Sequence, residues 1–198
     1  MKGKEPATVR ELLTEMKDIS ELIVDLAYSA VILDSKEIAE EVKRLEERMD
    51  KLLYEIRVTA MVAARNPKQA RQLAGLLQVA GAAEDISNAA GDIIKLLDTS
   101  IEHRPFLPSL FSKADEKIRT LVITQNSDMV DKTLGELGIE SETGTRVIAI
   151  CRGEKWRYAP QDSFVLKRGD RIVVRGVEDG YLKLREYAEG RKKWKELD

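Results

Sequence analysis

The chain has 198 residues, of which 43% are hydrophobic and 34% are charged, and its formal net charge is −2. This balance is typical of a folded protein, and it excludes a disordered chain and a strongly basic nucleic-acid binder. The single cysteine, Cys151, excludes an internal disulfide and favours a reducing compartment. No apolar stretch is long enough to span a bilayer or to act as a signal core. We therefore expect a cytoplasmic protein with no direct membrane insertion and no nucleic-acid partner.

The first hundred residues predict three long helices. Apolar residues recur at helical spacing over 9–31 and again over 38–56. Asp34 with Glu37 is typical of a capping box at the start of the second helix. Asn66, followed by a proline suited to a first helical turn, ends the second helix and begins the third.

The third helix is rich in alanine and contains Gly75, Gly81 and Gly91, a composition that predicts close approach between helices. The connections between the three helices are short, and short connections make neighbouring helices antiparallel. We therefore expect an all-α up-down helical bundle over residues 1–100.

A linker over 101–117 is indicated by Pro105 and Pro108, and it includes the only histidine, His103, which we expect to make a surface contact. After it the periodicity changes to short β-branched runs, which predict strands. Short helices and glycine turns separate these runs, so a small α/β domain is expected over 118–198. Its expected strands cover 118–124, 146–151, 155–158 and 171–175, and its expected helices begin near 133 and 178.

Two pairs of oxygen-bearing residues in the helical half share a spacing of four. Glu21 and Asp25 project from one helical face, and Glu84 and Asn88 repeat this spacing on the third helix. The first pair is expected to lie away from the apolar stripe and to be exposed. Carboxylate and amide oxygens suit a hard divalent or ferric cation. The alternative is a solvated acidic face, which is common on surface helices.

No catalytic constellation is present in the sequence. A serine triad would have to recruit the single linker histidine, and neither a nucleophile elbow nor a phosphate-binding glycine loop occurs. We therefore expect that the protein is not an enzyme.

The C-terminal half carries a specific order of motifs. Leu134-Gly-Glu-Leu137 precedes Gly144-Thr-Arg-Val-Ile-Ala-Ile150 and Arg152, and Pro160 and Gly169-Asp170 follow. This order strongly resembles the TrkA C-terminal (RCK-C) domain. In that arrangement we expect Gly169-Asp170 to make a tight entry to an edge strand. The resemblance implies a regulatory module of potassium channels and transporters that dimerises and, in several members, binds a small ligand at the dimer interface.

Three arginines are the expected ligand residues of this domain: Arg146, Arg152 and Arg168. A guanidinium group matches phosphate oxygens in bidentate geometry. The resemblance implies a cyclic dinucleotide such as cyclic di-AMP as the candidate ligand. The alternative is that these arginines only solubilise strand edges.

The helical half resembles a PhoU domain, whose helices carry Glu-x-x-x-Asp motifs implicated in metal binding. Glu21-Leu-Ile-Val-Asp25 matches that motif, whereas the second motif departs from it because Asn88 replaces the final aspartate. The leading hypothesis is therefore a homodimeric, ligand-sensing regulator of a membrane channel or transporter for cations, most plausibly potassium. The alternatives are a metal-binding regulator of phosphate uptake and a ligand-free dimeric adaptor.

Overall fold

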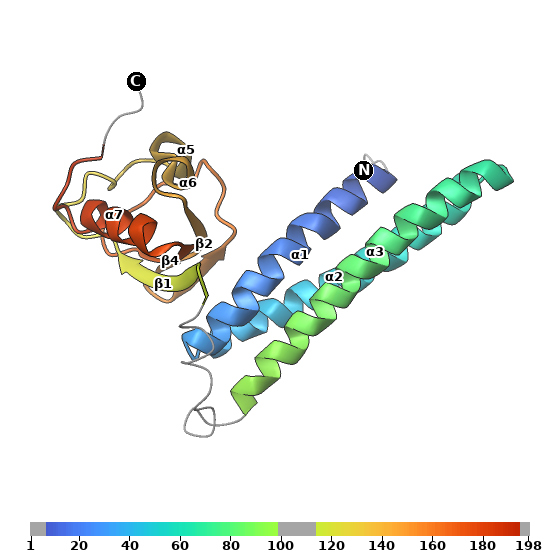
Figure 1. Ribbon diagram of the computed structural model, residues 1–198, viewed down its shortest axis with the longest axis horizontal. Coiled ribbons are helices and arrows are strands. Elements are labelled where there is room, and N and C mark those ends of the chain that lie inside the picture. Colours follow the sequence, from blue (N-terminus) through green and yellow to red (C-terminus); the bar gives the residue numbers. More distant parts are fainter. Residues whose placement is uncertain (1–6, 99–113, 195–198) are drawn as a thin grey trace, which may run out of the picture. The chain divides into compact units, whose positions relative to one another are not determined.

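The computed structural model describes residues 7–98 and 114–194, and the chain divides into two compact units, Met1–Ile101 and Glu102–Asp198 (Figure 1). Most of the expected linker over 101–117, with His103, Pro105 and Pro108, lies outside the described residues. Within the described ranges, no helix is both long enough and apolar enough to cross a membrane.

The first unit is a bundle of three long helices, as predicted (Figure 1). Every pair of these helices is in contact, so each helix buries a face against two neighbours. The core between them is made of large aliphatic and methionine side chains that are almost fully buried, among them Leu12, Met16, Met49, Leu52 and Ile56. The helices are α1 (Val9–Ile32), α2 (Lys36–Ala63) and α3 (Pro67–Ile94), and a short 3-10 turn, η1 (Lys95–Asp98), follows.

The helix starts confirm one sequence prediction and correct another. The Asn66 side chain accepts a hydrogen bond from the Gln69 backbone N–H at 2.9 Å and so caps α3 as expected. Helix α2 is capped by Ser35 and not by Asp34. Asp34 instead has a φ of +47°, because a left-handed residue is needed to reverse the chain after α1.

The three glycines of α3 differ in what surrounds them. A Cβ atom built at Gly91 would meet the Glu46 carboxylate of α2 at 2.5 Å, so the predicted close approach is confirmed there. At Gly75 and Gly81 such an atom would have nothing within 4 Å. The prediction of close approach is therefore wrong for these two positions within a single chain.

The second unit contains a four-stranded antiparallel sheet in the order β1-β4-β2-β3. The strands are β1 (Lys117–Val122), β2 (Thr145–Arg152), β3 (Lys155–Tyr158) and β4 (Arg171–Gly176), close to the predicted ranges. Strand β4 lies inside the sheet, so the expected edge strand after Gly169-Asp170 is wrong. Ile172, Val173 and Val174 are consecutive and all buried, and such a run suits a strand covered on both faces.

In the described part of this unit the sheet is accompanied by α5 (Leu134–Leu137), α6 (Ile139–Thr143) and α7 (Glu178–Ala188). They share a hydrophobic core with one face of the sheet, and the core includes Leu137, Ile139, Ile172 and Leu184. Helix α6 was not predicted. Gly138, with a φ of +51°, ends α5 and starts α6 at once, which leaves no loop for the sequence to signal.

Candidate functional site

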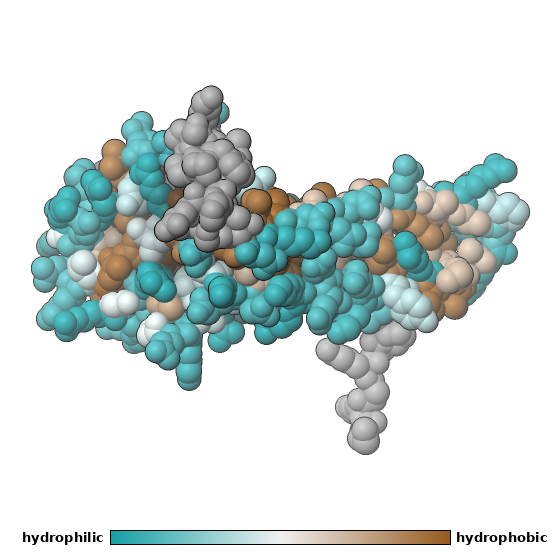
Figure 2. All heavy atoms as spheres, turned by 90° about the horizontal axis from the view of Figure 1, so that it is seen from below, coloured by the Kyte–Doolittle hydropathy of each residue, from teal (hydrophilic) through white to brown (hydrophobic). Residues whose placement is uncertain are grey.

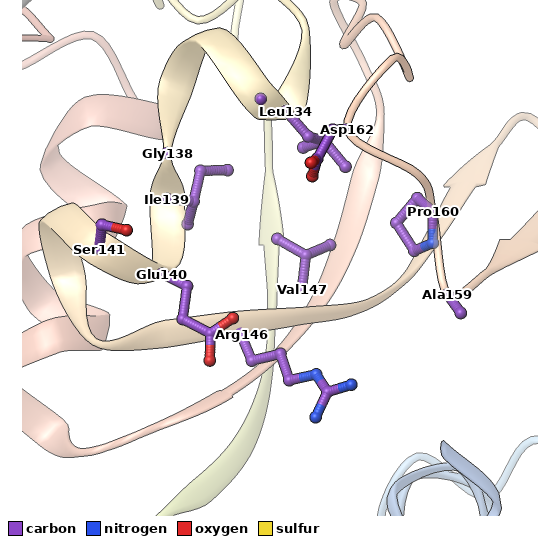
Figure 3. A pocket seen from close by; sticks show the side chains of 11 residues that line it. Leu134, Gly138, Ile139, Glu140, Ser141, Arg146, Val147, Ala159, Pro160 and Asp162 are labelled. Carbon is purple, nitrogen blue, oxygen red and sulfur yellow. The ribbon is translucent and has the colours of Figure 1, made fainter. Parts of the chain in front are cut away.

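A cavity of about 440 Å³ opens between α5, α6, the start of β2 and the loop after β3 (Figure 3). This volume lies within the range of about 300–1,000 Å³ that is usual for small-molecule pockets. Apolar walls are provided by each of the elements that enclose it, through Leu134, Ile139, Val147 and Pro160. The site prediction had selected none of these four residues, although three of them, Leu134, Val147 and Pro160, belong to the motifs that carried the resemblance.

The wall formed by the loop after β3 is held to α5 by backbone hydrogen bonds. The Gly135 N–H donates to the Asp162 carbonyl at 2.9 Å, and the Leu134 N–H donates to the Phe164 carbonyl at 3.0 Å. Glycine at position 135 favours this approach, because a Cβ atom there would lie 3.1 Å from the Asp162 Cβ, which is closer than ordinary van der Waals contact. The cavity therefore exists before any ligand arrives.

The start of β2 sets the directions of two neighbouring side chains. Val147 points into the cavity, whereas the Arg146 side chain leaves the opposite side of the strand and lies at the rim near Glu140 (Figure 3). A register shift between β2 and β4 falls between Val147 and Ala149. Such bulges redirect side chains beside functional sites. Of the three predicted ligand residues, Arg146 alone lines this cavity.

Arg152 has a different environment. Its guanidinium donates from Nε to Asp170 Oδ1 and from Nη2 to Asp170 Oδ2, both at 2.7 Å, and also to the Val165 carbonyl at 2.8 Å. Asp170 is fully buried, so this bidentate pair neutralises an interior carboxylate. The hydrogen bonds to Asp170 raise the pKa of Arg152 above its ordinary value. Within one chain this side chain is committed to the fold.

The three predicted arginines do not converge within one chain. Arg146 and Arg152 lie six residues apart on β2, which corresponds to about 20 Å along a strand. Arg168 is exposed in the turn before β4 and does not line the cavity. A ligand held in this cavity can therefore meet Arg146 but not all three side chains.

The four predicted metal-ligating residues are also placed by the structure. Glu21 forms an ion pair with Lys17 at 3.0 Å, and the Asn88 side chain donates to Glu84 at 2.8 Å. Among the described residues, no group of three or more His, Cys, Asp or Glu side chains is placed to share a metal ion.

Asp25 corrects the expectation that both members of the first pair are exposed. Only 4% of its surface is accessible. The C-terminal half of α1 is buried on several sides, because α1 contacts α2, α3 and η1. The apolar stripe in the sequence predicted a single buried face of α1. The structure buries residues on more than one side of its C-terminal half.

Both halves of the chain match known domain families. The family model for the PhoU domain matches residues 13–97, and that for the TrkA-C domain matches residues 118–189. These ranges coincide with the helical unit and with the sheet unit. The helical unit is therefore similar to the PhoU domain, and the sheet unit is similar to the TrkA-C domain.

A curated relative is Potassium channel protein 1 of Methanocaldococcus jannaschii, which is 29% identical over 85 residues. That match covers 43% of this chain and 26% of the relative, so the chain spans about a quarter of the relative's length. Neither the two matched family models nor this relative is described by its name as an enzyme.

Two solved structures are also similar to the chain. One is the RCK_C domain dimer of S. agalactiae BusR in complex with c-di-AMP, with 28% identity and a TM-score of 0.35. The match covers 36% of this chain and 93% of the BusR domain chain. The other is the RCK C domain of the potassium transport protein KtrA in complex with c-di-AMP, with 23% identity and a TM-score of 0.35. It covers 42% of this chain and 96% of that chain.

Proposed function

We propose that this protein is a non-catalytic, ligand-sensing regulator of a membrane channel or transporter for cations, with potassium as the transported ion. The observation that carries the proposal is the preformed cavity of the TrkA-C domain, with apolar walls and Arg146 at its rim. The relationship to a potassium channel protein supports the link to cation transport.

The candidate ligand is a cyclic dinucleotide, and cyclic di-AMP is its leading form. The faces of the nucleobases are apolar and suit walls made of Leu134, Ile139 and Pro160. The linking phosphates are anionic and suit a guanidinium group at the rim, because charge-assisted hydrogen bonds to phosphate are strong. Arg146 therefore contacts a phosphate and the apolar walls contact a base.

A homodimer completes the site in this proposal. The cavity is not fully enclosed, so one chain leaves a ligand of this size partly exposed. A second copy related by twofold symmetry brings an identical cavity to the same ligand, which is itself twofold symmetric. Ligand binding then favours one arrangement of the dimer, and this arrangement is transmitted to the membrane protein.

The test is calorimetric titration of the full chain with cyclic di-AMP. We expect saturable binding that Arg146→Ala weakens by about tenfold to a hundredfold, because a hydrogen bond to a charged group contributes about 1.5–3 kcal/mol. Arg168→Ala is the matched control, since it removes an exposed arginine of the same domain outside the cavity. It should bind the ligand as the unmodified chain does.

Absence of heat up to millimolar cyclic di-AMP would refute ligand sensing and leave the ligand-free adaptor. Equal binding by the Arg146→Ala variant would refute the assigned cavity. Copurification from native cells tests the partner separately. A cation channel or transporter is expected, whereas a phosphate-uptake protein would favour the alternative regulator.

A further inference from the structure

Helix α3 carries an exposed apolar seam in addition to its buried face. Two large side chains of this seam are exposed to solvent: Val79 is 62% exposed and Ile86 is 43% exposed. We define the α3 seam as Gly75, Val79, Ala82, Ile86, Ala89 and Ile93. The face that packs on α1 and α2 is made of other residues, namely Ala80, Ser87, Ala90, Gly91 and Ile94. Helix α3 is therefore apolar on two sides, of which the bundle covers one.

The spacing of the seam is that of a coiled coil. Its members follow one another at intervals of four, three, four, three and four residues, which is the a/d repeat that a second helix covers. Apolar residues gather in brown patches along the helical unit in Figure 2, among polar residues in teal. A surface helix with no further partner is expected to carry charged residues on such a stripe.

The charges of α3 indicate which helix covers the seam. Lys68 and Arg71 lie near its N-terminus, residues 72–83 contain no charge, and Glu84, Asp85 and Asp92 lie towards its C-terminus. This order opposes the preference of the helix dipole, which favours acidic residues at the start and basic residues at the end. It is, however, complementary to itself when a second α3 runs antiparallel.

We propose that the α3 seam is the interface for a second copy of this chain, with the two α3 helices antiparallel about a twofold axis. The axis passes between Ala80 and Gly81, which is the midpoint of α3, so the two helices overlap along their whole length. A twofold axis keeps the same flank of both helices on the same side and reverses their direction. The basic end of one helix thereby meets the acidic end of the other.

This register places large side chains against small ones. Gly75 lies opposite the partner's Ile86, and Val79 lies opposite the partner's Ala82. Interdigitation of large with small residues allows two helices to approach closely. The open space at Gly75, where an added Cβ would meet nothing within 4 Å, is then the place that the partner's Ile86 fills.

The same register brings opposite charges together at both ends. The partner's Asp92 lies opposite position 69, between Lys68 and Arg71. Each of these two basic residues is therefore at most two residues from Asp92 along the helix axis, or about 3 Å. No ion pair of Arg71 is formed within the described part of a single chain. Asp92 pairs with Lys95 on the surface, where 72% of its side chain is exposed and open to a further cation.

Disulfide trapping of the full chain tests this register. In a Cys151→Ser background, the double variant Gly75→Cys/Ile86→Cys should form a covalent dimer under mild oxidation, read on a non-reducing gel. Each single variant should remain uncrosslinked. In a single variant, the cysteine of one chain and the same cysteine of the partner lie eleven residues apart along the antiparallel pair, or about 17 Å. The Cα atoms of a disulfide lie within about 7 Å.

A second pair of cysteines, Gln72→Cys/Ala89→Cys, reports the crosslink while Gly75 and Gly81 are each replaced in turn. The two replacements form a matched steric control. Added to this pair, Gly75→Gln should reduce the crosslinked yield at least fivefold, because the longer side chain occupies the place of the partner's Ile86. Gly81→Gln adds the same side chain in equally open space but off the seam, and the yield should be unchanged.

Equal crosslinking by the single variants would overturn the antiparallel pairing. Absence of crosslinking in both double variants, with their thiols shown to be reactive, would overturn the interface itself. Equal effects of Gly75→Gln and Gly81→Gln would show that the seam is not the contact. Circular dichroism at 222 nm of every variant verifies that the bundle is folded.

Discussion

The two units of this chain differ in how their polar groups and glycines are used. In the sheet unit several of them are fixed by close contacts: Asp170 is buried under Arg152, Ser127 donates to the Tyr187 carbonyl at 2.8 Å, and Gly180 packs against the Thr143 carbonyl. In the helical unit many charges lie on the surface, and Gly75 and Gly81 face open space. A preformed interior suits a cavity that must recognise a ligand, whereas an incomplete surface suits a helix that must meet another chain.

Replacing Arg152 by alanine should give the largest effect. It leaves the fully buried Asp170 carboxylate without its bidentate partner. Loss of one partner of such a pair costs about 3 kcal/mol. Both tryptophans, Trp156 and Trp194, belong to the sheet unit, so their fluorescence during urea unfolding reports on that unit alone.

Arg168→Ala is the control for this substitution, because it removes an exposed guanidinium from the turn that precedes β4. Its effect should stay within about 0.5 kcal/mol. Equal stability of the Arg152→Ala variant and the unmodified chain would show that Asp170 is satisfied without this pair.

The same glycine-to-alanine change should have opposite signs in the two units. At Gly180 in α7 an added Cβ would meet the Thr143 carbonyl oxygen of α6 at 2.2 Å, so the helix would have to move. We expect Gly180→Ala to destabilise the sheet unit by about 2 kcal/mol, as overpacking does. At Gly81 the space is open, and alanine should stabilise the helical unit by about 1 kcal/mol because glycine is a poor helix former.

Unfolding followed by tryptophan fluorescence for Gly180→Ala, and by circular dichroism at 222 nm for Gly81→Ala, measures the two effects. A destabilised Gly81→Ala variant would contradict the open space at this position.

These contrasts explain which features the sequence could predict. The three helices and four strands follow from periods of 3.6 and 2, which depend on neighbouring residues alone. The interior position of β4 and the burial of Asp25 depend on which elements pack together over long distances in the chain. The role of Arg152 was missed for the same reason, since its partner Asp170 lies eighteen residues away. The apolar cavity walls resemble any other core residues in a sequence.

Changing Glu46 should have a smaller effect that depends on pH. Burial above Gly91 raises the pKa of the Glu46 carboxyl, and the nearby Asp50 raises it further, whereas Lys95 lowers it. A carboxyl whose pKa is raised in the folded state binds more protons there than in the unfolded state. The helical unit therefore loses stability as the pH rises from about 4.5 through the raised pKa.

Glu46→Gln removes this charge, so it should stabilise the helical unit at pH 7 and have little effect at pH 4. Thermal unfolding followed at 222 nm at both pH values measures the difference. Glu40→Gln is the control, since Glu40 is exposed and forms only a surface ion pair with Lys43. A Glu46→Gln variant that is destabilised at pH 7 would contradict the raised pKa.

Metal addition should have the smallest effect. Three or more ligands are not gathered in the described residues of one chain, and Glu21 and Asp25 differ in exposure, with Asp25 buried. We expect Mn²⁺, Mg²⁺ or Fe³⁺ to raise the melting temperature of the helical unit by less than about 2 °C, because only tight binding to the folded state stabilises it strongly. A larger rise that Glu21→Gln abolishes would support the metal site of Glu21, Asp25, Glu84 and Asn88, with further ligands from a second copy. Asp25→Asn is the less suitable variant, because replacing a buried side chain lowers stability even without metal.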